Sequence, residues 1–170
     1  VVTAVIAAGA PRVVRSPQTS PWESAMSSDQ SSVGRPIGRL NIVTGLFYMA
    51  AFMVYGFILI YLRDFSPDKE QWIAESLDGD HFEARLAHVH GNLFALLNIT
   101  FGFVMLKLPV RGRLGLWASR LILGGLLMPV GILAEVYFGL WPVPVLMGGI
   151  SILSGTVALG VAIARGSEPG

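Results

Sequence analysis

The residues best suited to chemistry lie together in the segment Arg85-Leu-Ala-His-Val-His-Gly-Asn92, where polar groups open an apolar run that continues to Leu106. This segment holds His88 and His90, two of the three histidines in the chain, and His81 lies just upstream. Imidazole groups bind metals and haem iron, and they exchange protons near neutral pH. The segment is therefore the first place to expect a metal or cofactor site.

Helical geometry separates the two histidines of this segment. At about 100° per residue, the side chains of His88 and His90 point about 160° apart, so they cannot both bind one metal ion from a regular helix. Three small or polar residues share the face of His88: Gly91, Asn92 and Ala95. One hypothesis is a flat macrocycle against Gly91 and Ala95 with its iron bound by His88, and His90 is the other candidate metal ligand. The alternative is that the small residues only allow close helix packing.

Length and composition place these residues in a membrane protein. Of 170 residues, 53% are hydrophobic and only 14% are charged, and the mean hydropathy is +0.62. Four apolar stretches are long enough to cross a hydrocarbon core of about 30 Å, at residues 42–62, 86–108, 114–140 and 143–164. Lipid offers the backbone no hydrogen-bond partners, so each stretch must be a helix. We predict an all-α integral membrane four-helix bundle over residues 37–166, after a flexible cytoplasmic tail at residues 1–36.

Charge and cysteine content narrow the classes of function. A formal net charge of +1 gives no reason to expect a nucleic-acid partner, and the absence of cysteine excludes disulfides, thiolate metal sites and cysteine nucleophiles. The connection between the first two helices carries seven acidic residues: Asp64, Asp68, Glu70, Glu75, Asp78, Asp80 and Glu83. Basic residues precede the first helix and occupy the second connection with the start of the third helix: Arg12, Arg15, Arg35, Arg39, Lys107, Arg111, Arg113 and Arg120. The positive-inside rule then predicts cytoplasmic termini and an outward-facing histidine segment.

The predicted topology brings other polar residues to the depth of His88. Glu135 and Tyr137 lie near the outer end of the third helix, and Tyr55 lies near that of the first, all within roughly 10 Å of depth at 1.5 Å per residue. Glu135 is the only acid in the four apolar stretches, and an intramembrane ionisable residue marks either a function or a paired partner. We therefore predict Glu135, Tyr137 and Asn92 as candidate catalytic residues.

Simpler roles and a different metal remain open for these residues. Glu135 could reach water at the interface or only hydrogen-bond a histidine, and His88 could only bond a backbone carbonyl. A zinc site made of His81, His88 and Glu135 is a further alternative, although the spacing matches no known zinc motif.

Two patterns indicate how the helices pack. Four residues of the first helix share one face and are expected to point inward: Gly45, Tyr48, Phe52 and Tyr55. Ser151 and Gly155 form a small-xxx-small pair that lets helices approach closely, within one chain or between copies. Residues 71–78 have helical periodicity and form either a short surface helix or part of a solvated acidic cap.

The motif Ala87-His-Val-His-Gly-Asn-Leu93 in a four-span layout resembles two groups of bacterial membrane proteins. One is the styrene-oxide isomerase family of small four-helix haem b proteins. In that family the second helix begins with an Arg-x-Ala-His-like motif that a glycine follows, and Arg85, Ala87, His88 and Gly91 occupy similar places here. The other is a set of small proteins similar to part of the catalytic subunit of haem–copper oxidases, which carry an Ala-His-x-His-x-Asn-Leu pattern. The resemblance implies haem b on His88 and a multi-pass protein of the bacterial inner membrane.

The chain departs from the isomerase pattern in two places. The asparagine that follows the ligand by about six residues in that family is Phe94 here, and Asn98 lies on the same side one turn deeper. Glu135 and Tyr137 match the isomerases' acid and tyrosine of the third helix in kind but not in register. The resemblance therefore favours haem binding over isomerase activity.

We predict a haem b-binding membrane protein, in one version a Lewis-acid isomerase of small apolar epoxides. A second version is a non-catalytic electron-transfer or sensory subunit, with a second iron ligand from His81 or from His90 of another copy. A third is an accessory membrane subunit without a cofactor. The expected partners are membrane lipid, a small apolar substrate and further copies of the chain.

Overall fold

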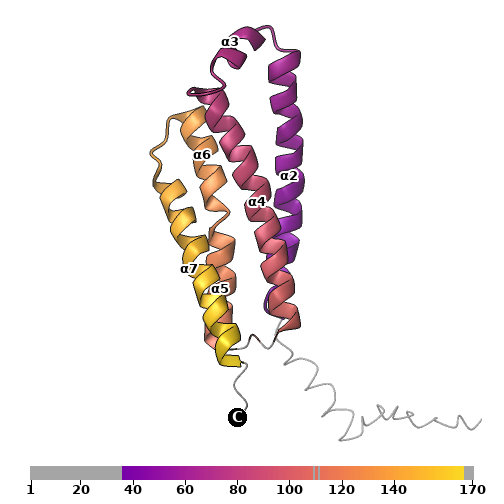
Figure 1. The fold of residues 1–170 in the computed structure, drawn as a ribbon, viewed down its shortest axis with the longest axis vertical. Coiled ribbons are helices and arrows are strands. Elements are labelled where there is room, and N and C mark those ends of the chain that lie inside the picture. Colours follow the sequence, from indigo (N-terminus) through magenta and orange to yellow (C-terminus); the bar gives the residue numbers. More distant parts are fainter. Residues whose placement is uncertain (1–35, 109, 111, 167–170) are drawn as a thin grey trace, which may run out of the picture. The chain divides into compact units, whose positions relative to one another are not determined.

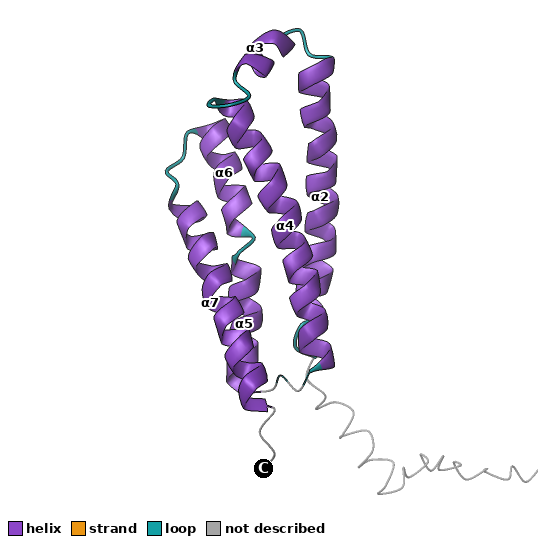
Figure 2. Cartoon of the chain, viewed as in Figure 1, coloured by secondary structure: helices purple, strands orange, loops and turns teal. Residues whose placement is uncertain are grey.

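The computed structural model describes residues 36–108, 110 and 112–166, and every regular element in them is a helix (Figure 2). The elements are α2 (Arg39–Asp64), α3 (Lys69–Ala74), α4 (Asp80–Lys107), α5 (Gly112–Gly124), α6 (Leu127–Phe138) and α7 (Val143–Gly166). Four stretches are long and apolar enough to cross a membrane: Arg39–Asp64, Asp80–Lys107, Gly112–Phe138 and Val143–Gly166. The prediction of an all-α fold with four such helices is confirmed, whereas the tail predicted at residues 1–36 lies, except for Pro36, outside the described residues.

The spans pack in an order that places α4 between two neighbours (Figure 1). α2 packs along α4, α4 also contacts α6, and α7 packs against both α5 and α6. We call the end of the bundle that bears the acids of residues 64–83 the acidic end. The opposite end, where α2 and α5 begin and α4 and α7 finish, is called the basic end and carries Arg39, Lys107, Arg113 and Arg165. The direction in which the bundle crosses the membrane stays a prediction.

α2 and α4 approach closely because each helix has a glycine at a position where the other helix packs against it. A Cβ atom at Gly45 would lie 2.8 Å from the carbonyl oxygen of Ala95, and one at Gly91 would overlap the ring of Phe52. Phe52 is buried and stacks on Tyr48 with ring centroids 4.9 Å apart. The inward face predicted for the first helix is confirmed at these positions.

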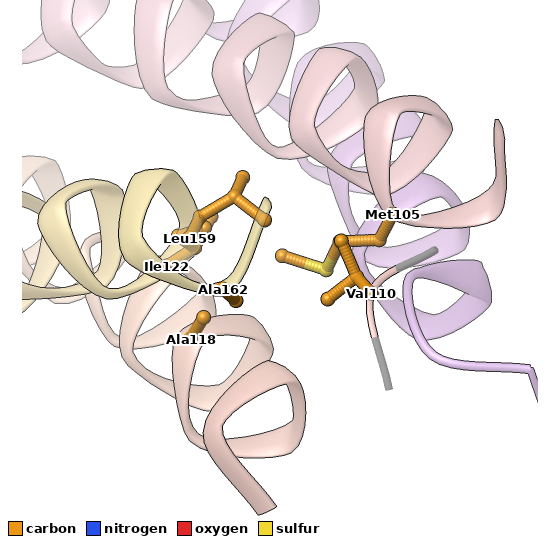
Figure 3. Packing of buried hydrophobic residues seen from close by; sticks show 6 residues of the cluster. All are labelled: Met105, Val110, Ala118, Ile122, Leu159 and Ala162. Carbon is orange, nitrogen blue, oxygen red and sulfur yellow. The ribbon is translucent and has the colours of Figure 1, made fainter. Parts of the chain in front are cut away.

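α5 and α7 meet in the main apolar cluster, which also includes the far end of α4 (Figure 3). Its buried members are Met105, Val110, Ala118, Ile122, Leu159 and Ala162. Gly155 lies directly against Ile122, and the hydroxyl of Ser151 donates a hydrogen bond of 2.8 Å to the carbonyl oxygen of Leu121. The small-residue pair of the fourth span therefore packs inside the chain.

The third span is broken into two helices, whereas hydropathy predicted one continuous stretch over residues 114–140. α5 ends at Gly124 and α6 begins at Leu127. Pro129 has no backbone N–H, so the carbonyl of Gly125 accepts instead from the N–H of Met128 at 3.1 Å. Flexible glycines just before a proline explain why the helix breaks here rather than bending gently.

Side chains from other spans satisfy backbone groups at the break. The hydroxyl of Tyr48 donates to the carbonyl of Leu126 at 2.7 Å, and the amide of Asn98 donates to the carbonyl of Ile122 at 3.2 Å. In lipid, such groups have no water to bond, so a break in a helix requires partners of this kind.

Asn41 and Asn98 are fully buried and form a polar network between α2, α4 and α5. The amide of Asn41 donates to the side-chain oxygen of Asn98 at 3.1 Å and to the carbonyl of Ser119 at 3.0 Å. Asn98 donates its second N–H to the carbonyl of Phe94 at 3.0 Å. All polar atoms of Asn98 are thus used within the bundle, which leaves none for a bound molecule.

Candidate functional site

The histidine helix begins earlier than expected, and His81 is part of it. α4 starts at Asp80, and the ring of His81 stacks on Trp72 of α3 with centroids 4.5 Å apart. The Nδ1 atom of His81 lies 2.6 Å from the carbonyl oxygen of Trp72. The first connection thus contains a short helix, but it covers Lys69–Ala74 and not residues 71–78, the last four of which are turns. His81 helps to hold this helix on α4. With Nδ1 engaged, Nε2 is the free nitrogen of this ring.

His88 faces α2. Its ring lies against the backbone of Gly56, where a Cβ atom would be 2.7 Å from the imidazole Cε1, and the ring of Tyr55 is 6.3 Å away between centroids. The amide nitrogen of Asn92 donates to the carbonyl of His88 at 3.0 Å and lies only 3.4 and 3.5 Å from the two ring nitrogens. Those distances are at the limit of a hydrogen bond, so the ring nitrogens of His88 can bind a ligand.

His90 lies on another side of α4. Its Nδ1 atom is 2.9 Å from the carbonyl oxygen of Leu86, one turn earlier in the same helix, and its ring meets Phe94 edge-on at 5.9 Å. The two histidines that helical geometry separates are thus separated in the structure. Of these two histidines, His88 is the one that lies against α2.

An open groove of about 670 Å³ adjoins His88 between α2 and α4, near the acidic end. It is lined by Met53, Gly56, Phe57, Leu59, Ile60, Arg63, His81, Arg85, His88 and Asn92. Its volume lies within the range of roughly 300–1,000 Å³ that is usual for small-molecule sites. Arg63 pairs with Asp64 at 2.8 Å, and Arg85 reaches the carbonyl of Ser76 only at 3.4 Å. The groove therefore combines apolar walls with two histidines, an amide and two exposed guanidinium groups.

Gly91 and Ala95 lie outside this groove. The Phe52 ring covers Gly91, and Ala95 is fully buried beside Gly45. The surface that these small residues form on α4 is therefore covered by α2. The open space beside His88 lies next to Gly56 instead.

The candidate catalytic residues are only partly brought together. Asn92 lines the groove with His88. Tyr137 is linked to the region through Tyr55, because their hydroxyl oxygens are 3.1 Å apart and join α6 to α2. Glu135 is exposed, and its carboxylate forms no hydrogen bond or ion pair with the residues that the structure describes, although its backbone carbonyl accepts from the N–H of Gly139 at 2.9 Å. Three of the residues predicted to share one depth thus lie next to one another, because Tyr55 neighbours both His88 and Tyr137.

No three His, Cys, Asp or Glu side chains within residues 36–108, 110 and 112–166 are grouped to hold a metal ion. The zinc site considered for His81, His88 and Glu135 finds no support there, since Glu135 does not line the groove. The α2 side of the site, above all Gly56 and Arg63, was not predicted from the sequence. Their only signal was a glycine inside an apolar helix and an arginine at its end.

Four helices of this length and apolar composition are typical of a multi-pass membrane protein. Comparison of the chain with protein-family models, with curated proteins and with solved structures gave no match. The groove and its residues are therefore the basis for a functional proposal.

Proposed function

We propose that this protein binds haem b in the groove between α2 and α4, with His88 as an axial ligand of the iron. The observation that carries the proposal is that His88 lines an open groove while its ring nitrogens lack a close hydrogen-bond partner. An imidazole nitrogen that is shielded from water normally hydrogen-bonds a protein group, and the Nδ1 atoms of His81 and His90 lie within hydrogen-bond distance of backbone carbonyls here.

The groove offers a partner for each chemical part of haem b. Iron takes an imidazole nitrogen, which His88 supplies. The flat macrocycle needs apolar walls, and Met53 and Phe57 of α2 provide them. The two propionates need cations. Arg85 makes only a long contact of 3.4 Å with the carbonyl of Ser76, so its exposed guanidinium group can bind a carboxylate with two parallel hydrogen bonds. Arg63 already binds both carboxylate oxygens of Asp64, at 2.9 and 2.8 Å, and would bind the second propionate through the remaining edge of its guanidinium group.

A specific observation supports a second version of this function. His81 lines the same groove as His88, and its Nε2 atom is not engaged. Two histidine ligands suit an electron carrier, whereas one histidine leaves the iron open to a substrate. The count of histidine ligands therefore separates the non-catalytic version from the catalytic one.

In the catalytic version the chain positions a small apolar substrate, such as an epoxide. Bound haem iron would supply Lewis acidity. The exposed α2 side chains Phe57 and Ile60 give the groove an apolar opening, through which such a molecule can enter from lipid. Asn92 carries the one side-chain amide among the residues that line the groove. Its amide donates to the carbonyl of His88, and the second N–H of this amide would orient an oxygen atom of the substrate. We propose Asn92 as the substrate-orienting residue in this version.

Visible absorption spectra of the purified protein in detergent, oxidised and reduced, test the proposal. Haem is supplied during expression, and His88→Ala is compared with His90→Ala, a matched control on another side of the same helix. A Soret band that is lost with His88→Ala and kept with His90→Ala supports the site. A folded parent without a Soret band refutes haem binding. The change from a low-spin to a high-spin spectrum in His81→Ala would identify the version with two histidine ligands.

A further inference from the structure

A second groove opens at the basic end, where α2 begins beside α5. Its volume is about 510 Å³. It is lined by Pro36, Ile37, Gly38, Arg39, Leu40, Val43, Leu116, Ser119, Arg120 and Leu123. Two arginines thus share one groove with a wall of aliphatic side chains. This groove is separate from the one that contains His88.

Arg120 is unusual because it lies inside a membrane-crossing stretch. It is eight residues beyond Gly112, about 12 Å along the helix at 1.5 Å per residue. Charged residues within a span are costly, by about 2.5–3.5 kcal/mol at the centre, and normally face a partner or a polar ligand. Its one neighbouring aromatic ring, Trp117, has its centroid 5.7 Å from the guanidinium carbon and does not neutralise the charge.

No acidic side chain of the described residues is close enough to pair with Arg39 or Arg120. The acids of residues 36–166 that the structure describes lie within residues 64–83 or at Glu135, toward the other end of the bundle. The only ion pair found among them joins Arg63 and Asp64. The two groove arginines therefore have no acidic partner among the described residues, and their exposed guanidinium groups can receive an anion. α2 begins at Arg39, so the partial positive charge of its N-terminus adds to theirs.

We infer that this groove binds one anionic phospholipid, with the headgroup phosphate held by Arg39 and Arg120. Guanidinium groups bind phosphate oxygens with strong paired hydrogen bonds. The acyl chain would lie on Leu40, Val43 and Leu116, which are all exposed. A soluble anion would leave this aliphatic wall uncovered, whereas a lipid uses both halves of the groove. Basic pockets between membrane helices are known to take anionic headgroups in this manner.

Native mass spectrometry of the full chain in neutral detergent tests the inference without reference to haem. The protein is titrated with phosphatidylglycerol and with phosphatidylcholine of the same acyl chains. The parent is expected to prefer phosphatidylglycerol. A basic residue near a membrane surface contributes about 1 kcal/mol, or about fivefold in affinity, so Arg39→Gln with Arg120→Gln should weaken that binding by about thirtyfold.

The matched control is Arg113→Gln with Arg165→Gln. It removes the same charge at the same end of the bundle, from exposed residues that do not line the groove, and should change the affinity little. Leu116→Trp keeps both arginines and fills the aliphatic wall, so it should also lose phosphatidylglycerol.

Equal binding of the two lipids by the parent would overturn the inference. So would an equal loss in the control pair, which would show only general charge attraction. Full retention of lipid by Leu116→Trp, or its displacement by inorganic phosphate, would overturn the role of the acyl chain. Each result is independent of whether a Soret band is present, so this inference and the haem proposal fail separately.

Discussion

Gly56→Ala tests the haem site by moving His88 without removing any of its atoms. The added Cβ atom would lie 2.7 Å from Cε1 and 3.3 Å from Nε2 of the imidazole. Carbon atoms pack without strain at about 3.5 Å or more, so the ring must move by about 0.8 Å. A ligand is held productively only within about 0.5 Å, and a misplacement of about 1 Å can cost roughly a hundredfold. We expect haem affinity to fall by about ten- to a hundredfold.

The same substitution should leave the fold nearly as stable as before. Alanine favours a helix interior over glycine by about 0.5–1 kcal/mol. The clash falls on the ring of His88, the movable end of a side chain, so the cost of relief is about the same size or smaller. The matched control is Gly160→Ala on α7, where no atom lies within 4 Å of the added Cβ. That control should gain stability by about 0.5–1 kcal/mol and keep full haem affinity.

The assay is a haem titration followed at the Soret band, with thermal unfolding measured on the same samples by tryptophan fluorescence. A Gly56→Ala variant that binds haem as tightly as the parent, while His88→Ala does not bind it, would refute the reasoning. It would mean that His88 binds iron on a side that does not face α2. Loss of haem in Gly160→Ala as well would show a general effect of glycine replacement.

Three further sets of substitutions test the contacts around the site. Asn98→Leu removes three hydrogen bonds and should lower the free energy of unfolding by about 2 kcal/mol, at about 0.6 kcal/mol each in a membrane protein; Asn92→Leu, measured by the same denaturation, should lose less. Tyr55→Phe and Tyr137→Phe remove one shared hydrogen bond, so each should cost about 0.6 kcal/mol and the double variant no more than one single variant. Trp72→Phe should be as stable as the parent in a thermal melt, because the buried indole N–H has no hydrogen-bond partner among the residues that the structure describes. Trp72→Ala should unfold α3, as seen by faster amide exchange.

The contradicting results are equally specific. Equal losses for Asn98→Leu and Asn92→Leu would show that the buried network contributes no more to stability than the half-buried hydrogen bonds of Asn92. Additive losses in the tyrosine double variant would show that Tyr55 and Tyr137 act separately. A Trp72→Phe variant as unstable as Trp72→Ala would show that the indole N–H has a partner, such as an ordered water.

The sequence predicted the spans well because hydropathy is a local property, and the four predicted stretches all lie within observed helices or end close to them. It placed the start of the second helix too late, since hydropathy marks only the apolar part and α4 continues beyond it to Asp80. Helical periodicity was also enough to place His88 and His90 on different sides. It could not show which of them meets α2, because that depends on how each helix is rotated against its neighbour. Gly56 had no recognisable role for the same reason.

The break in the third span has a consequence for how the protein enters a membrane. A continuous apolar helix satisfies its own backbone and can leave the translocation machinery alone. The segment around Gly125 and Leu126 cannot, because carbonyls there bond to Tyr48 and Asn98, which belong to earlier spans. Its insertion is therefore expected to require the first two helices to be present, so that the third helix is integrated as a unit with them. The order of the spans along the chain, with both donors made first, suits that dependence.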